Sequence, residues 1–395
     1  MTKQEYMQQL SRALEGYEQG FVQEILESYE EHFEAGLKNG RSEEEICREL
    51  GDIEELLREM GDEMECKKEE ATGLKPMTAI EPQQVQYSGI SKVQLNLREM
   101  DAEISRSADG ELHVCLQSGE DLALYLEEQV QGDTYLLTEK EPMSKQPILN
   151  LASLLRMMHT PTQKLLVELP ERIEFLRGKT TSGDLKLQKL NSRAVELEST
   201  SGDIKIAQMV AEESVIKASS GDIQLRQVNT AEMVLQSSSG DIDWEDGQVQ
   251  QALMRVVSGD IELTHIGGQK VEIKSSSGDI ELNGVRGENW RVETSSGDVE
   301  LSRSEVEQLE ILSSSGDVEG EYYAQSSRIE TSSGDIDLRL ERKGKELQAK
   351  VRTVSGDSNV HGQVNLNGSG VEWESDPQKY IRGEFISRSG DIRVL

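Results

Sequence analysis

Residues 199–225, STSGDIKIAQMVAEESVIKASSGDIQL, contain one full period of a repeat that occupies the second half of the chain. The period is marked by a Ser-Gly-Asp triplet whose glycine returns every 19 residues, at Gly183, Gly202, Gly221, Gly240, Gly259, Gly278, Gly297 and Gly316. Three more triplets follow at steps of 18, 22 and 34 residues, at Gly334, Gly356 and Gly390. Seven identical steps do not arise by chance, so this region is predicted to be a stack of equivalent units.

Apolar residues alternate with polar ones inside each period. The positions two and four residues after the glycine are apolar, as in Ile204 and Ile206, and so is the position five residues before it, as in Ile216. A spacing of two with polar residues between is the period of a β-strand. One such unit is too small to bury its apolar face, whereas stacked units bury a continuous core. We therefore predict a mainly β fold: a parallel single-stranded β-solenoid (β-helix) of 19-residue strand–turn–strand–turn coils, with a small all-α N-terminal domain.

The triplets place one aspartate of every coil in a column. Its predicted members are Asp184, Asp203, Asp222, Asp241, Asp260, Asp279, Asp298, Asp317, Asp335 and Asp357. Asp and Ser side chains bond nearby backbone groups and stabilise turns, so a structural turn column is the favoured interpretation. Calcium binding by this row of carboxylates is the alternative. The calcium-binding β-roll repeat has nine residues and several glycines, which this repeat does not share.

The N-terminal region has a different pattern. Tyr6 and Leu10 lie on one helical face, and Tyr29 and Phe33 lie on another, at spacings of three and four residues. Ser42 with Glu45 forms a capping box that predicts the start of a further helix. The expected organisation is a helical module at 1–65, a linker at 66–90, an irregular β cap region at 91–178 with an apolar segment at 145–160, a regular solenoid at 179–358, and a C-terminal coil and cap at 359–395.

The apolar segment is the candidate interaction surface of the solenoid side. On a helix, its side chains Leu151, Leu154, Leu155 and Met158 would lie on one side. Such a surface can dock a partner protein or touch a membrane. The alternative, which we favour, is that the segment covers one end of the solenoid.

Composition excludes several classes of function. The formal net charge is -33, which repels nucleic acids and anionic lipids, so no nucleic-acid partner is expected. The three cysteines form no CxxC pair, which suits a reducing compartment. The first residues have no apolar stretch behind them and no run of about 18 apolar residues follows, so we expect neither a signal peptide nor a membrane span. The expectation is a cytoplasmic protein, with peripheral membrane association as an alternative.

Catalytic signatures are missing from the sequence. GxGxxG, P-loop, GxSxG and HExxH motifs are absent, and the five histidines are scattered. The carboxylates recur identically in coil after coil, whereas a catalytic site occurs once. We therefore expect no enzymatic activity, no catalytic residue, no metal and no cofactor.

Two resemblances bear on function. The motifs Lys3-Gln4-Glu5-Tyr6, Ser28-Tyr29-Glu30-Glu31-His32-Phe33 and Leu50-Gly51-Asp52 resemble a bacterial helical domain that is encoded beside PadR-type regulators. The Ser-Gly-Asp-Ile/Val repeats, with the strands from about Lys92, resemble a bacterial adhesin-like β-solenoid family. That family implies a non-enzymatic protein, with several members in loci linked to cell-envelope stress.

These observations lead to one functional hypothesis and one alternative. The hypothesis is a non-enzymatic interaction or scaffold protein of bacterial envelope stress or signalling. Its helices would bind a regulatory or membrane-associated protein partner, and its solenoid would present a ligand-binding face. The alternative is an exported adhesin or carbohydrate-binding surface protein.

Overall fold

The computed structural model describes residues 2–14, 26, 29, 30, 33, 37, 41–50, 85–140, 163–366 and 376–395. The chain divides into one compact unit of residues 1–80 and 141–161 and another of residues 81–140 and 162–395. The described α-helices belong to the first unit, here the helical unit, and the strands to the second, here the solenoid. Within the described ranges, no helix has the length and apolar character needed to cross a membrane.

The helical unit contains α1 (Lys3–Ala13) and α3 (Glu43–Leu50). The capping box predicted at Ser42 is confirmed: its backbone N–H donates to Glu45 Oε2 at 2.9 Å, and the Glu45 N–H donates to Ser42 Oγ at 3.3 Å. A second box, between Thr2 and Glu5, starts α1. The unit has its own apolar core, formed by Tyr6, Leu10, Leu14, Tyr29, Phe33, Ile46, Cys47 and Leu50.

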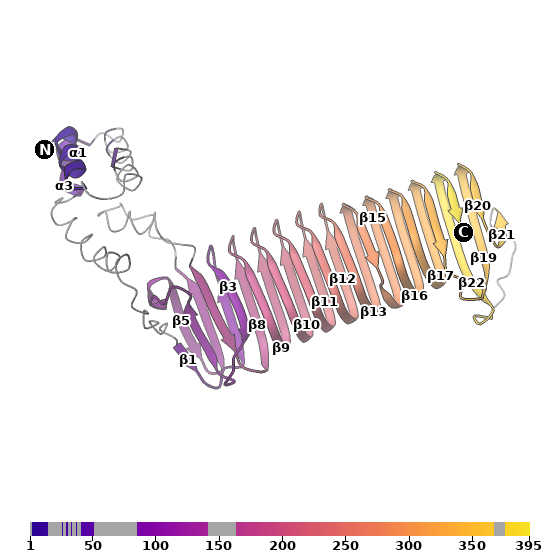
Figure 1. Ribbon diagram of the computed structural model, residues 1–395, viewed down its shortest axis with the longest axis horizontal. Helices are drawn as coiled ribbons and strands as arrows, with labels where there is room; N and C mark the ends of the chain where they lie inside the picture. The colour runs from indigo at the N-terminus through magenta and orange to yellow at the C-terminus, as the bar shows by residue number, and fades with distance from the viewer. Residues whose placement is uncertain are drawn as a thin grey trace, which may run out of the picture. The chain divides into compact units, whose positions relative to one another are not determined.

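The solenoid is built from one strand or a pair of strands in each coil (Figure 1). Its first elements are β1 (Val85–Tyr87), β2 (Lys92–Asn96), β3 (Asp101–Arg106), β4 (Leu112–Leu116), the 3₁₀ helix η1 (Leu122–Leu124), β5 (Leu126–Gln131), β6 (Thr134–Glu139), β7 (Lys164–Leu169) and β8 (Ile173–Thr180). The regular coils are β9 (Leu185–Ser199), β10 (Ile204–Ala218), β11 (Ile223–Ser237), β12 (Ile242–Val256), β13 (Ile261–Ser277), β14 (Ile280–Asn283), β15 (Arg286–Ser296), β16 (Val299–Ser315), β17 (Val318–Ser333) and β18 (Ile336–Leu340). The last elements are β19 (Glu346–Ser355), β20 (Ser358–Val360), β21 (Gln363–Leu366), β22 (Tyr380–Ser389) and β23 (Ile392–Val394).

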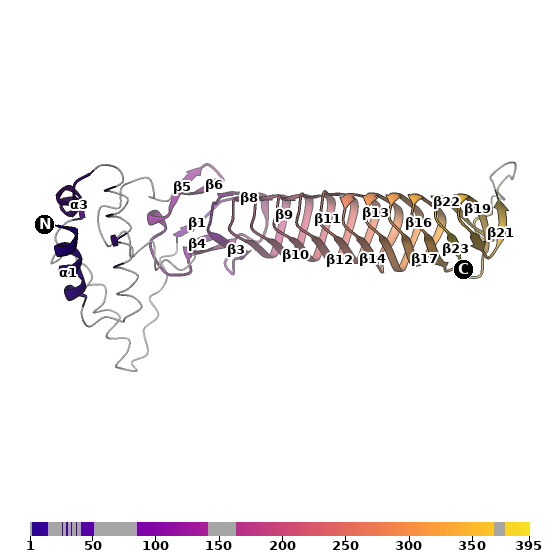
Figure 2. The ribbon, with the colours of Figure 1, turned by 90° about the horizontal axis from the view of Figure 1, so that it is seen from above.

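Successive regular coils pair in parallel at the 19-residue offset. Ile204 lies opposite Ile223, which lies opposite Ile242, and all three side chains are fully buried. The other apolar positions of the repeat stack in the same way, and one continuous core extends from Ile90 to Val394. Figure 2 shows the coils following one another in a single row. The predicted β-solenoid is therefore confirmed.

The Ser-Gly-Asp corner is tight because backbones of neighbouring coils touch there. A Cβ on Gly240 would lie 2.1 Å from the carbonyl oxygen of Gly221, so only glycine fits. The small residue three positions before the glycine closes the corner from inside: buried Ser237 donates its Oγ–H to the Gly240 carbonyl at 2.6 Å. Ser199 makes the same bond to Gly202 at 2.6 Å.

The opposite bend differs from the expected second turn. It lies within one long strand, where inter-coil pairing skips Gln208 and Glu212 of β10. Gln208 has a φ of 58°, and equivalent residues of other coils share this left-handed conformation. Those residues are Lys189, Gln227, Asp246, His265, Gly284 and Arg303. One left-handed residue and a second unpaired position four residues later therefore replace a turn sequence in each coil, which is why no turn motif marks this side.

The N-terminal end of the stack is closed by antiparallel strands. β4 pairs antiparallel with β7, β1 with β4, and β5 with β6. The Glu139 carboxylate accepts backbone N–H bonds from Arg98, Glu99 and Met100, at 2.6, 3.2 and 3.3 Å. These strands occupy the edge on which another chain could add by strand pairing.

The C-terminal end is arranged differently from the sequence order. From the order of the triplets in the chain, we expect the coil of Gly356 to lie directly on that of Gly334 and the residues from 359 onward to form a terminal coil and cap. In the structure, β22 and β23 lie between these coils: β22 pairs with β17 on one side and β19 on the other, and β23 pairs with β18 and β20. The last segment of the chain is thus an internal coil, and β21 pairs on the outer side of β19.

Candidate functional site: a polar groove on the solenoid

The aspartate column connects neighbouring coils. The carboxylate Oδ1 of Asp184 accepts the backbone N–H of Asp203 at 2.8 Å, and Asp203 accepts that of Asp222 at 3.0 Å. The column continues in spatial order through Asp241, Asp260, Asp279, Asp298, Asp317, Asp335, Asp391 and Asp357. It begins one coil earlier, because Asp101 accepts the Asp184 N–H at 2.8 Å.

Sequence reasoning missed two members of this column. Asp391 stands in a Ser-Gly-Asp triplet and was detectable, but its place between Asp335 and Asp357 follows only from the inserted coil. Asp101 has no triplet around it. The bonds are charge-assisted and run between coils, so each carboxylate before Asp357 fixes the register of the coil beside it.

A second row of carboxylates lies two residues further along each coil. Its members face one another in the strand register: Asp243, Glu262, Glu281, Glu300, Glu319 and Asp337. Desolvation and the neighbouring carboxylates, with Glu262 the first among them, raise the pKa of Asp243 and of Glu281. No group of three or more His, Cys, Asp and Glu side chains in the described part of the chain has the arrangement of a metal site.

The aspartate column leads to a prediction about calcium. Addition of a chelator such as EDTA is expected to leave the melting temperature of the full-length protein unchanged, because every column Oδ1 before the last aspartate, Asp357, already accepts a backbone N–H. Differential scanning fluorimetry with and without added calcium measures this. A fall of several degrees with EDTA that calcium reverses would show that the column holds the ion.

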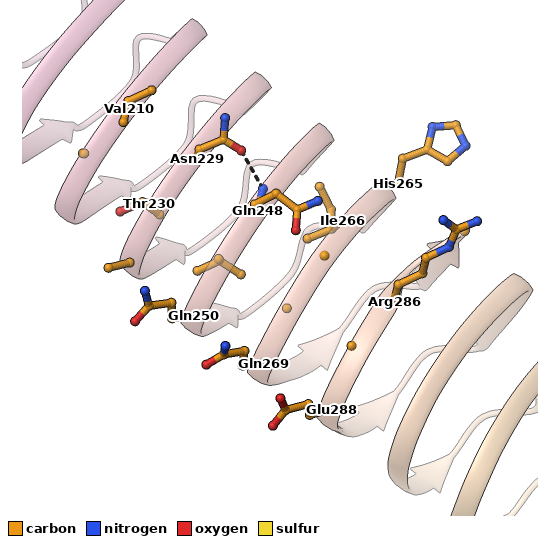
Figure 3. A pocket seen from close by; sticks show the side chains of 17 residues that line it. Val210, Asn229, Thr230, Gln248, Gln250, His265, Ile266, Gln269, Arg286 and Glu288 are labelled. Carbon is orange, nitrogen blue, oxygen red and sulfur yellow. Dashed lines mark hydrogen bonds between the residues drawn. The ribbon is translucent and has the colours of Figure 1, made fainter.

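A groove of about 890 Å³ lies where the chain bends within its long strands. It crosses successive coils, and its lining comes from β10, β11, β12, β13 and β15 (Figure 3). Successive paired residues form its floor row: Val210, Asn229, Gln248, Gly267 and Arg286. Two residues beyond each of the last four lies its rim row, formed by Ala231, Gln250, Gln269 and Glu288. We call this site the polar groove.

Small residues open the groove locally. A Cβ on Gly267 would lie 2.1 Å from Gln248 Oε1, so the glycine makes room for that amide. Gln248 is fixed at its backbone as well, because its N–H donates to Asn229 Oδ1 at 3.0 Å (Figure 3). Val249 and Ile266 are buried beneath the exposed amides. The surface that the groove presents is therefore formed by the exposed polar side chains and by glycine backbone, with the solenoid core beneath it.

The middle of the groove carries no charge. Its floor residues Asn229, Gln248 and Gly267 are neutral, and so are its rim residues Ala231, Gln250 and Gln269. Charge returns at the groove's end with Arg286 and Glu288. This window is unusual in a chain in which 30% of the residues are charged.

One histidine stands on the other side of the groove. His265 is exposed at the left-handed bend of β13, with its Nδ1 3.4 Å from Asp246 Oδ1. Figure 3 shows His265 and Arg286 on one side and Gln250, Gln269 and Glu288 along the other. The groove therefore has hydrogen-bonding amides in its middle and the titratable His265 and Glu288 at its edges.

The structure does not test the predicted interaction surface, and the groove that it does describe was not predicted. Leu151, Leu154, Leu155 and Met158 lie outside the residues that the structure describes. Sequence analysis did not single out the groove. The sequence did contain an indication of the groove, because the residues eight and ten positions after Gly221, Gly240 and Gly259 are all neutral. This pattern can be recognised only when the repeats are aligned with one another.

Two family models match the chain, one over the solenoid and one over the helical unit. A family model described as Toastrack DUF4097 matches residues 90–266 and 248–395, and a model described as HAAS matches residues 5–59. A comparison with curated proteins finds no match.

Several solved structures are similar to the chain. One is named as a candidate lipid-binding protein from Parabacteroides distasonis, with 17% identity, a TM-score of 0.36, and coverage of 65% of this chain and 93% of its own. A candidate adhesin from the same organism has 13% identity, a TM-score of 0.36, and coverage of 65% and 91%. A candidate adhesin from Bacteroides fragilis has 14% identity, a TM-score of 0.33, and coverage of 65% and 96%.

Proposed function

Because the chain belongs to the Toastrack DUF4097 family, we propose that it is a non-enzymatic interaction protein whose solenoid presents a ligand-binding face. The observation that carries the proposal is the polar groove, where a repetitive surface changes to an uncharged one over three adjacent coils. Positions that repeat in every coil are explained by the stacking of the coils. A change confined to a few coils is not explained by stacking, and we attribute it to ligand binding.

The chemistry of the groove suits binding. Asn and Gln side chains donate and accept hydrogen bonds but exchange no proton near neutral pH. General acid–base catalysis needs titratable groups within hydrogen-bond reach of the reacting atoms. The neutral middle of the groove offers exposed amides, and the titratable His265 and Glu288 lie at its edges. Convergent polar groups of this kind orient a bound ligand.

The helical unit is proposed to bind a protein partner in envelope-stress or signalling regulation. Its match to the HAAS model and its separate apolar core support a module with its own role. The solenoid would then couple ligand binding to the partner held by the helices. An exported adhesin or carbohydrate-binding protein is the second candidate, favoured by the neutral groove.

A variant in the helical core tests this division of labour. Leu10 is fully buried in the helical unit, so Leu10→Asp places an unpaired charge there. We expect loss of helical circular dichroism and a fall of about tenfold in partner recovered with tagged full-length protein, since a helical docking surface needs its fold. The solenoid's tryptophan fluorescence should melt as before, because its core is separate.

The control is Gln251→Glu, an exposed substitution in the solenoid that should leave partner recovery unchanged. Equal recovery of the same partner with Leu10→Asp would refute the role of the helices. Release of new reducing ends from a polysaccharide by the purified full-length protein would refute the non-enzymatic assignment. Cell fractionation separates the regulatory proposal from the exported adhesin.

A further inference from the structure

We propose that the polar groove binds a neutral, polyhydroxylated chain, that is, a segment of an uncharged glycan. This inference rests on the proposed function and specifies its ligand. It follows from three properties of the groove: the kind of hydrogen-bonding groups, the local absence of charge, and the direction in which the groove runs.

The hydrogen-bonding groups match hydroxyls. A hydroxyl both donates and accepts a hydrogen bond, and an amide side chain offers a donor NH₂ beside an acceptor oxygen. Asn229, Gln248, Gln250 and Gln269 place four such amides on three neighbouring coils. Carboxylates only accept and lysines only donate, so a surface of either kind satisfies a row of hydroxyls less completely.

The electrostatics disfavour charged ligands in this place. The chain has a net charge of -33, which repels polyanions. A polycation would find stronger attraction at the carboxylate row that contains Asp243, Glu262 and Glu281 than at six neutral positions. Glu212 precedes the neutral stretch of the rim row and Glu288 ends it. A neutral ligand that lies between these two glutamates is not repelled by the net charge and is not attracted to the carboxylate row.

The shape favours a chain over a single small molecule. The floor row passes from Val210 to Arg286 through five successive coils. Coils of a parallel stack lie about 4.8 Å apart, so the row is about 19 Å long. Gly267, Gly268 and Gly287, which carry no side chain, keep the surface low at one end of this row. A sugar ring can approach the backbone closely at these glycines while its hydroxyls meet the amides.

The test measures binding of defined glycans to full-length protein by isothermal titration calorimetry. The neutral probes are cellohexaose, laminarihexaose, mannohexaose and N-acetylchitohexaose, and the charged probes are oligogalacturonate and chitosan hexamer. At least one neutral probe is expected to bind. Gln250→Glu with Gln269→Glu removes two amide donors and adds two charges, and should weaken that binding about tenfold or more.

The matched control is Gln251→Glu with Gln308→Glu, which adds the same charge at exposed positions outside the groove. It should change the dissociation constant less than twofold. Binding of no neutral probe, or equal weakening by both double variants, would overturn the glycan assignment. Neither result affects the proposed partner binding by the helical unit, which Leu10→Asp tests separately.

Discussion

Gly240→Ala is expected to lower the free energy of unfolding of the solenoid by about 3 kcal/mol or more. The added Cβ would lie 2.1 Å from the Gly221 carbonyl oxygen and 2.6 Å from its carbonyl carbon. Both are backbone atoms in the adjoining coil, so no side chain can rotate away. The coils must separate at this corner, which weakens the bond from the Asp241 N–H to Asp222 Oδ1 at 3.0 Å.

Urea unfolding followed by tryptophan fluorescence measures this loss. The three tryptophans are Trp244, Trp290 and Trp373, so none lies in residues 1–80 and the signal reports the solenoid. Ser239→Ala is the control, since it adds no atom in the same turn and should shift the free energy by less than about 0.5 kcal/mol. An unfolding midpoint equal to that of the parent protein would show that the corner tolerates a side chain.

Ile280→Asp is expected to be at least as damaging, with a loss of about 4 kcal/mol or more. Ile280 has no exposed surface and lies in register between Ile261 and Val299. An aspartate there would be surrounded by aliphatic side chains above and below. Since each coil is stabilised mainly by its two neighbours, the stack should divide at this coil.

Ile280→Val is the matched control. The next coil already has Val299 at the equivalent position, so valine fits and should lose only about 1 kcal/mol. Limited proteolysis followed by mass spectrometry would locate the cut near β14 in the aspartate variant. Full resistance of Ile280→Asp to urea and protease would mean that the buried stack does not hold the solenoid together.

The interior of the solenoid could be predicted from sequence because one rule applies to each coil. The glycine step gives the unit, and the apolar positions after it give the buried face, as Ile204, Ile223 and Ile242 show. Parallel pairing then follows from repetition, since identical units bury the same face in the same register.

The order of the last coils could not be predicted in this way. Each coil carries the same Ser-Gly-Asp corner, so the corner of Gly390 fits on that of Gly334 as well as the corner of Gly356 would. The Asp335 carboxylate accepts the Asp391 N–H at 2.7 Å, and Asp391 in turn accepts the Asp357 N–H at 2.8 Å. A repeat pattern specifies what a coil contacts, and not which coil provides the contact.

The sequence by itself determined the repeat unit, the buried face and the aspartate corner, because these depend on residues within one period. The tertiary structure alone decided three further features: the bend at Gln208, the insertion of β22 and β23, and the polar groove. The bend needs a backbone conformation that several residue types adopt under the constraint of the stack. The groove joins Asn229, Gln248 and Gly267, which lie 19 residues apart in the chain and become neighbours only when parallel coils pair.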